Sequence, residues 1–380
     1  MTLHHHRHRA RWMLLVLVGL LLAAAPVALA NQAASSSPLK PVSGTTGPLP
    51  GGDISDAPPH LLEAAPVAEP AAYPPDPWRL HATIPTGGRY LVAGTTVDND
   101  NLYIFGGSTG TTYLDEVWHY DRASATWTAK APLPEPMGNL SVAYNPRDGM
   151  IYVAGGWQDV YYSNALHRYD PASDTWETLA PLPTAKSGAA IGIVDNVLYL
   201  FGGNGGGSFN DTQVYDIATN TWFVGPAMPV PQHSYGGQVT YRGSIYVLSS
   251  FSVNHMLRYD TRTQTWEQGP NMLATRNSPS CVISRDGIIS CWGGGDSWTG
   301  RSDGESYDLA DWPNGSWQPI EGQPMPTPAI RAGHACLGKH LWVAGGAAQS
   351  SLYLDMNQSW YGSFVCDWGE PSAFLPLVTR

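Results

Sequence analysis

The sequence predicts an all-β fold made of one small antiparallel sheet repeated six times, and three recurring markers predict it. A glycine pair begins at Gly106, Gly155, Gly202, Gly293 and Gly345, with Ser249-Ser250 in the missing slot, so the successive spacings are 49, 47, 47, 44 and 52 residues. A Tyr-Asp pair follows, at Tyr120, Tyr169, Tyr215, Tyr259 and Tyr307. A tryptophan comes next, at Trp127, Trp176, Trp222, Trp266 and Trp317. A period of about 50 residues with such markers indicates a repeat architecture.

Each repeat contains about four short strands. In the unit from Met150 to Pro183, β-branched and aromatic runs are separated by Gly, Pro, Asn and Asp, and no gap is long enough for a helix. One such sheet cannot bury both of its faces alone, whereas radial stacking of similar sheets supplies the missing neighbours and leaves only short edges. The sequence therefore predicts a six-bladed β-propeller with four-stranded antiparallel blades.

The order Gly-Gly, Tyr-Asp, Trp at this spacing resembles the kelch repeat, from about Trp78 to Trp360. The resemblance is to the galactose oxidase-like kelch superfamily, in an exported bacterial form. It implies that the glycine pair lets a strand end turn sharply and that the Tyr and Trp side chains fill the space between blades. It also implies a binding platform or, less often, an enzyme.

The first 72 residues are expected to lie outside the propeller. Residues 1–30 have a basic start, an apolar run and Ala28-Leu29-Ala30 as a small-x-small cleavage site, which together indicate a secretory signal peptide cut before Asn31. An uncleaved anchor is the alternative, but a membrane span needs about 20 apolar residues. Residues 31–72 are rich in Pro, Ala and Ser and predict a disordered spacer. We assign 73–368 to the propeller and 369–380 to a tail, and expect a secreted, periplasmic or cell-surface protein.

Trp78 predicts how the ring closes. It precedes Gly106 by 28 residues, and the later distances from tryptophan to the next pair are 28, 26, 27, 27 and 28, so it is in register as the last strand of a repeat that has no beginning. We expect this strand to pair with the last repeat and remove two free edges. Trp360 follows Gly345 by 15 residues, against 17 to 24 elsewhere, so residues 360–368 are expected to add an extra or imperfect strand.

The five repeat tryptophans are expected in the core, since replacing a buried Trp by Ala typically costs about 3–5 kcal/mol. The four cysteines should form disulfides in an exported chain. Cys281 and Cys291 are equidistant from Asp286 in a turn signal, so a hairpin would place them opposite each other. Cys336 and Cys366 would then form the second pair.

Composition limits the partners. Without Arg7, Arg9 and Arg11 of the predicted signal peptide, 17 basic residues face 31 acidic ones, and this net charge of −14 disfavours nucleic acid. The spacings His-Glu-x-x-His, Gly-x-Ser-x-Gly and Cys-x-x-Cys are absent from the sequence. We expect no cofactor, no metal and no stable membrane span, and a monomer.

Candidate ligand-binding residues lie in the loops after the glycine pairs and in the loops that enter each repeat, which share one face in the propellers that this chain resembles. They are Trp157, Tyr161, Tyr162, Trp298, His233, Tyr235, Arg276 and Arg331. The aromatic side chains would stack on sugars or anchor a protein, and the cations would attract a carboxylate. Alternatively, the aromatic rings tuck between loops, and the arginines, which recur near repeat starts, have a structural role.

Two functions remain open. The first is an exported, non-catalytic propeller that binds a protein or a glycan. The second is an enzyme acting on sugars, similar to the sialic acid mutarotase or to galactose oxidase. No long insertion interrupts the repeats to bring in a catalytic acid, and the Tyr, His and Cys of a copper site cannot be assembled from the sequence. We therefore favour binding and assign no catalytic residue.

Overall fold

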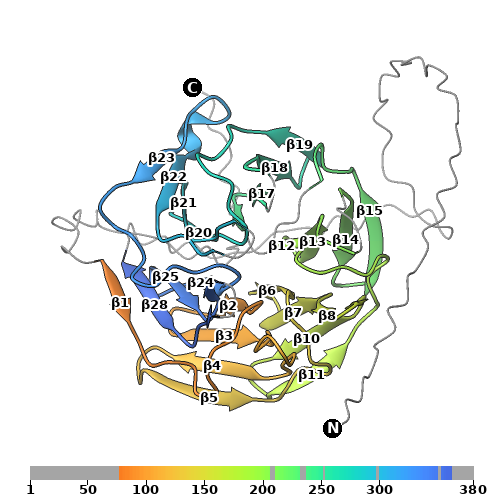
Figure 1. Cartoon of the computed structure of the whole chain (residues 1–380). Helices are drawn as coiled ribbons and strands as arrows, with labels where there is room; N and C mark the ends of the chain where they lie inside the picture. The colour runs from red at the N-terminus through yellow and green to blue at the C-terminus, as the bar shows by residue number, and fades with distance from the viewer. Residues whose placement is uncertain are drawn as a thin grey trace, which may run out of the picture. The chain divides into compact units, whose positions relative to one another are not determined.

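A computed structural model describes residues 77–205, 210–231, 237–250, 253–296, 299–349 and 352–361. Within these residues the chain forms six four-stranded antiparallel sheets around a common axis, as the sequence predicts (Figure 1). Two short hairpins and one 3-10 helix, Leu309–Asp311, are added to this ring. The predicted spacer residues 31–72 and the tail residues 369–380 lie outside the described residues.

The sheets, called blades 1 to 6, follow one another along the chain. Blade 1 contains β2 (Ala93–Thr96), β3 (Asn101–Phe105), β4 (Val117–Asp121) and β5 (Thr126–Lys130). Blade 2 contains β6 (Ser141–Asn145), β7 (Met150–Ala154), β10 (Leu166–Asp170) and β11 (Thr175–Thr178), with the hairpin β8 (Trp157–Gln158) and β9 (Tyr161–Tyr162). Blade 3 contains β12 (Ala190–Val194), β13 (Val197–Phe201), β14 (Thr212–Asp216) and β15 (Thr221–Gly225).

The second half of the ring repeats this plan. Blade 4 contains β16 (Gln238–Tyr241), β17 (Ser244–Leu248), β18 (Met256–Asp260) and β19 (Thr265–Gln268). Blade 5 contains β20 (Ser280–Ile283), β21 (Ile288–Trp292), β22 (Gly304–Asp308) and β23 (Gln318–Ile320). Blade 6 contains β24 (Gly333–Leu337), β25 (His340–Ala344), β28 (Asn357–Tyr361) and β1 (Trp78–Leu80), with the hairpin β26 (Ala347–Gln349) and β27 (Leu352–Tyr353).

The two ends of the described chain meet in blade 6. Strand β1 pairs with β28, in the register Trp78 to Trp360, which confirms the predicted N-terminal closure (Figure 1). The expectation for Trp360 is corrected, because Trp360 lies on the third strand of a complete blade and not on an extra strand. Trp360 occupies the position that Tyr169 holds in blade 2, where Tyr169 pairs with Trp176.

The repeat tyrosines and tryptophans both join neighbouring blades, but they do so by different contacts. The tyrosines are at most 1% exposed, and Trp317 is buried in the core as expected. Trp127, Trp176, Trp222 and Trp266 pack against the core clusters but are only partly buried, which corrects the expectation of full burial. Each indole N–H instead donates a hydrogen bond to a main-chain carbonyl in the segment that leaves the preceding blade. The pairs are Trp78 to Gln323, Trp127 to Ala82, Trp176 to Ala131, Trp222 to Ala180, Trp266 to Pro226 and Trp317 to Pro270.

Hydrophobic clusters fill the spaces between neighbouring blades. Phe105 of blade 1, for example, packs edge-on against Tyr169 and Trp176 of blade 2.

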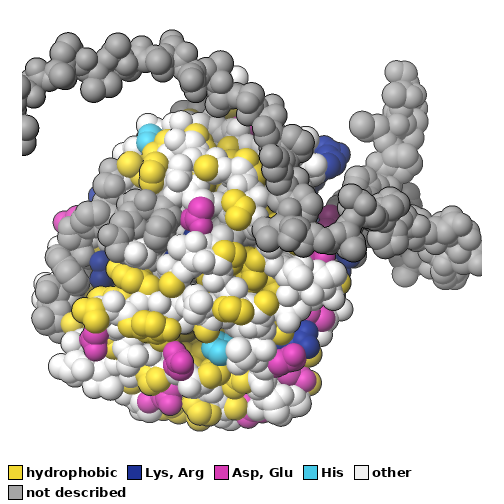
Figure 2. Space-filling model, turned by 90° about the vertical axis from the view of Figure 1, so that its right-hand side faces the viewer, with side chains coloured by type: hydrophobic (Ala, Val, Ile, Leu, Met, Phe, Trp, Pro, Cys, Tyr) yellow, Lys and Arg dark blue, Asp and Glu magenta, His cyan; other side chains and the backbone are white. Residues whose placement is uncertain are grey.

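The outer surface seen in Figure 2 is mostly hydrophobic and uncharged polar, with acidic side chains in small groups. Among the described residues no helix has the length and apolar character needed to cross a bilayer.

Ser249, the first serine of the blade 4 pair, adopts the backbone of the first glycine in the other blades. Ser249 has φ of 54°, close to 57° at Gly106 and 64° at Gly155. A serine there carries the steric cost that glycine avoids. Its hydroxyl offsets part of that cost, because Ser249 Oγ accepts the Arg276 amide N–H at 2.8 Å and donates to the Val253 carbonyl at 3.0 Å.

The Cys281–Cys291 disulfide is present as predicted. The two cysteines are directly opposite each other on β20 and β21, with Cα atoms 4.1 Å apart. Cys336, on β24, is also disulfide-bonded. Cys366 lies outside the described residues, so its pairing with Cys336 stays a prediction.

Candidate functional site

Two sets of loops form one face of the propeller, which we call the loop face. One set enters the blades, and the other follows the glycine pairs. Main-chain bridges join the two sets at Tyr90 and Ser108, Gly138 and Trp157, Ser187 and Asn204, and Ile330 and Ala347. The loop sets that the sequence analysis grouped together are therefore neighbours.

Five aromatic side chains lie one after another in space across the loops of blades 6, 1 and 2. We call them the aromatic sector: Tyr353, Tyr90, Tyr113, Trp157 and Tyr161. The rings of Tyr353 and Tyr90 stack, with centroids 4.5 Å apart and planes at 11°. Tyr113 meets Trp157 edge to face, with centroids 5.6 Å apart. Gly110, at φ of 90°, lies under the Tyr353 ring, where any Cβ would collide with it. The loop of blade 1 can approach blade 6 this closely because that residue is glycine.

The two hairpins carry the exposed part of this sector. Val160, at the tip between β8 and β9, is 94% exposed, and Tyr161 beside it is 50% exposed. Leu352 on β27 is 48% exposed. These exposed apolar side chains adjoin Trp157 and Tyr353 of the packed aromatic pairs along the chain, and exposed apolar surface is a common mark of an interaction site when it is continuous.

Trp157 and Tyr162 are less accessible than Tyr161, since both are partly buried. The main chain of Trp157 exchanges two hydrogen bonds with Gly138, at 2.8 and 3.0 Å, and its ring contacts Tyr113. The structure thus supports the alternative that aromatic rings tuck between loops for Trp157, and it leaves Tyr161 as the more exposed aromatic anchor.

Arg331 lies beside the axis on the loop face. Its φ is 58°, and it lines a cavity of about 60 Å³ together with Asn139, Gln238, Ser278 and His334. Burial raises the pKa of Tyr113 to about 12 and also raises that of Tyr90, and the Arg331 charge opposes the rise in both. The guanidinium is therefore close enough to the aromatic sector to act on two of its phenols.

A larger cavity of about 200 Å³ continues along the axis, lined by the innermost strands of all six blades. His334 of β24 lines both cavities. Burial lowers the pKa of His334 to about 4, so this imidazole is neutral near pH 7. The wall also contains Thr95, Gln238 and Thr240, which leave the channel polar and nearly uncharged.

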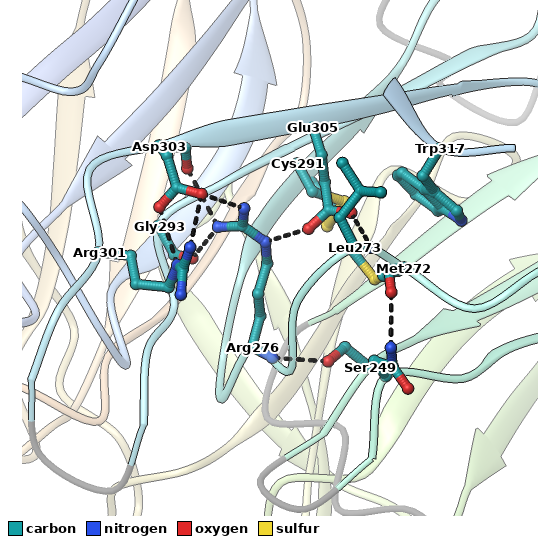
Figure 3. A network of polar contacts seen from close by, with 12 residues as sticks. Ser249, Met272, Leu273, Arg276, Cys291, Gly293, Arg301, Asp303, Glu305 and Trp317 are labelled. Carbon is teal, nitrogen blue, oxygen red and sulfur yellow. Dashed lines mark hydrogen bonds and ion pairs between the residues drawn. A yellow bond between two sulfur atoms is a disulfide. The ribbon is translucent and has the colours of Figure 1, made fainter. Parts of the chain in front are cut away.

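The structure contradicts the expectation that the charge of Arg276 is available to attract a carboxylate of a ligand. Its side chain is 1% exposed and binds Glu305 through Nε, Asp303 at 2.8 Å through Nη2, and the Gly293 carbonyl at 2.8 Å through Nη1 (Figure 3). Burial by itself would raise the pKa of Asp303, but hydrogen bonds and charges from Arg301 and Arg276 lower it to about 2. Arg276 therefore fixes the loops of blade 5, because its charge is used internally.

The same position carries a buried cation in blades 1 and 3. Arg89 is 1% exposed and pairs with Glu116 at 2.7 Å, and Lys186 is 1% exposed and pairs with Asp211 at 2.7 Å. Burial lowers the pKa of Lys186, and the Asp211 carboxylate opposes that change. The recurrence of cations at repeat starts thus reflects internal ion pairs in alternate blades.

Sequence comparisons decide the family. The family described as "KLHDC2/KLHL20/DRC7 Kelch-repeats domain" matches residues 78–247 and 132–286, which together span more than half of the chain. The chain belongs to the kelch-repeat family. A curated relative, the Kelch-like protein terF of Aspergillus terreus (strain NIH 2624 / FGSC A1156), is 27% identical over 192 residues. The match covers 47% of this chain and 42% of the relative, so the chain spans less than half of that protein's length. Because this relative is fungal, the comparisons do not support the expected bacterial exported type.

Several expected site residues of the kelch propeller cannot be placed. His233, Tyr235 and Trp298 lie outside the described residues. Within the described part of the chain, no three His, Cys, Asp or Glu side chains are grouped so that they could hold a metal ion.

Sequence reasoning missed Tyr90, Tyr353 and the exposed apolar residues of the hairpins. Tyr90 directly follows Arg89, which the sequence analysis examined only as a recurring cation. Tyr353 stands in the last loop after a glycine pair, the same loop type that supplies Tyr161. Counting aromatic residues in every loop of this type would have found it.

Proposed function

We propose that this kelch propeller is a non-catalytic protein-binding module that uses the aromatic sector as its contact surface. The observation that carries the proposal is the pair of hairpins of blades 2 and 6, which hold Val160, Tyr161 and Leu352 exposed beside two packed aromatic pairs. Rigid aromatic side chains supply large contact areas at low conformational cost and are enriched at binding hot spots. The family as a whole serves commonly in protein interaction, which agrees with this use.

The proposal includes export of the chain. The basic and apolar N-terminal segment and the disulfide support it, because disulfides persist in oxidising compartments.

A peptide display screen tests the proposed surface. Random 12-residue peptides selected on the immobilised propeller would be titrated against Tyr161→Ala and Leu352→Ala variants. Phe223→Ala is the matched control, since Phe223 is a 39% exposed aromatic on β15, the outer strand of blade 3. We expect affinity to fall about 10-fold or more in the first two variants and less than about 2-fold in the control, about 1.4 kcal/mol being one factor of ten.

Equal affinity in all three variants would contradict the proposal. A glycan array probed with the same proteins provides the second arm. Binding of a glycan with loss in Tyr161→Ala, in the absence of any selected peptide, would replace a protein partner by a carbohydrate.

A further inference from the structure

The described chain begins on the blade that bears one of the exposed hairpins. Pro77 accepts a hydrogen bond from Tyr361 at 2.9 Å, beside the start of β1, at the end of blade 6 opposite the loop face. Along the chain, the hairpin β26–β27 connects β25 to β28 of the same blade. Whatever precedes Pro77 is thus tethered to the blade that supplies Leu352 and Tyr353.

The path from this tether to the aromatic sector is short. From Tyr361 back to Leu354 the chain advances seven residues, or about 23 Å at about 3.3 Å per residue. A polyproline II segment of ten residues covers about 31 Å at about 3.1 Å per residue. Residues 57–66 can therefore lie over the aromatic sector while residues 67–76 span the height of the blade.

The composition of this segment suits the surface. Residues 57–76 contain six prolines, the apolar residues Leu61, Leu62 and Val67, three carboxylates and no Lys or Arg. Prolines favour the extended backbone that aromatic surfaces bind, because less conformational entropy is lost on docking. The exposed Leu352 and Tyr161 offer apolar contacts, and Arg331, beside Tyr90, offers a positive charge at the inner end of the path.

We propose that residues 57–66 dock on the aromatic sector of their own propeller, with residues 67–76 as the connection to β1, and compete there with the external partner. The inference rests on the proposed function for the identity of the competing partner, but the docking itself does not depend on it. A covalent tether of this length gives the segment a local concentration of about millimolar order, so even weak docking would occupy the surface. The external partner must then displace the segment.

Hydrogen exchange on the chain beginning at residue 31 tests the docking. One variant carries Pro58→Ser, Pro59→Ser, Pro66→Ser and Pro70→Ser, and the matched control carries Pro38→Ser, Pro41→Ser, Pro48→Ser and Pro50→Ser. All eight positions precede β1, so both variants keep the closing strand. We expect amide exchange in residues 108–114, 157–163 and 352–354 to be at least about 5-fold faster in the first variant than in the unaltered chain. Exchange in the control and in blade 3 should change less than about 2-fold. Equal rates in all three proteins would overturn the proposal.

A cross-linking arm identifies what occupies the surface. With Leu62→p-benzoylphenylalanine, irradiation should join residue 62 to the hairpin β8–β9 or β26–β27 of the same molecule. Cross-links between two molecules would overturn the intramolecular proposal in favour of a second copy, and cross-links to the outer strands alone would overturn docking at this surface.

Competition separates this inference from the proposed function. The peptides selected by display should bind at least about 5-fold more tightly to the variant with serines at positions 58, 59, 66 and 70 than to the unaltered chain. If no peptide is selected, the exchange and cross-linking results still decide the docking. If selected peptides lose affinity in Tyr161→Ala yet bind both chains equally, the proposed function stands and the competition is refuted.

Discussion

Replacing Arg276 by Met should destabilise the propeller by about 3–5 kcal/mol, because it leaves a buried carboxylate without its counter-charge. Glu305 is 1% exposed, and after the change its remaining hydrogen bond is the one that it accepts from the Leu273 amide at 2.7 Å. The carbonyl of Gly293, which accepts from Arg276 at 2.8 Å, also loses its side-chain donor. Figure 3 shows these groups converging on the guanidinium.

The double variant Arg276→Met with Glu305→Gln separates the cost of the unpaired charge from the loss of packing. Gln keeps an acceptor for the Leu273 amide and carries no charge, so the double variant should recover roughly half of the loss. Arg168→Met is the matched control, because the Arg168 and Glu177 side chains are 31% and 57% exposed and such a pair contributes about 0–1 kcal/mol.

Urea unfolding followed by far-ultraviolet circular dichroism gives the free energy of unfolding for each protein, with the slope checked for two-state behaviour. A loss below about 1 kcal/mol for Arg276→Met would refute the reasoning. The reasoning would also be refuted if the double variant lost as much free energy of unfolding as Arg276→Met and Glu305→Gln lose in sum, since neighbours in one network should be coupled.

Three further outcomes test the fold. A chain starting after Pro85 should melt well below a chain starting at residue 73, because it lacks β1 and the 3% exposed Trp78; equal melting temperatures would disprove the closure. Replacing Cys281 and Cys291 together by Ser should lower the free energy of unfolding, measured in urea, by about 2–4 kcal/mol. Reactive thiols from all four cysteines in the unaltered denatured protein would rule out the disulfides. Stability should fall between about pH 6.5 and about pH 4, because the unfolded chain protonates His334 near 6.5 whereas the folded protein does so only near 4. His334→Gln should make that decline shallower, with the rest coming from His81, whose pKa burial also lowers to about 4, and an unchanged pH profile would argue against the lowered pKa of His334.

The fold was predictable because its signals are local and repeat in every blade. The glycine pairs and the tyrosines each recur in five of the six blades, and the fourth-strand tryptophans recur in all six, so their spacing alone indicates the ring. Trp360 was misplaced because a tryptophan stands where other blades have tyrosine. Its distance of 15 residues from Gly345 matches the 14 residues that separate Gly155 from Tyr169, and comparison with that interval would have assigned its strand.

The roles of the cations were less predictable, since burial depends on a partner elsewhere in the chain. Arg89 pairs with an acid 27 residues later, Lys186 with one 25 residues later and Arg276 with acids 27 and 29 residues later. This interval joins the loop that enters a blade to the residues at the start of the third strand of that blade. A cation with an acid at that distance is therefore better interpreted as a loop clamp than as a ligand contact.

The aromatic sector could not be derived from any single repeat, because it is made between repeats. Tyr90 and Tyr353 are 263 residues apart in the chain and stack because the ring closes. Blade 1, which lies between the two hairpins, is also the blade in which Arg89 pairs with Glu116 directly before Tyr90. The ion pair of the buried Arg89 thus holds the loop that supports Tyr90, and the exposed hairpins extend from a surface whose centre is fixed. Loops that vary around such a rigid support are the parts of a propeller that can change partner without changing the fold.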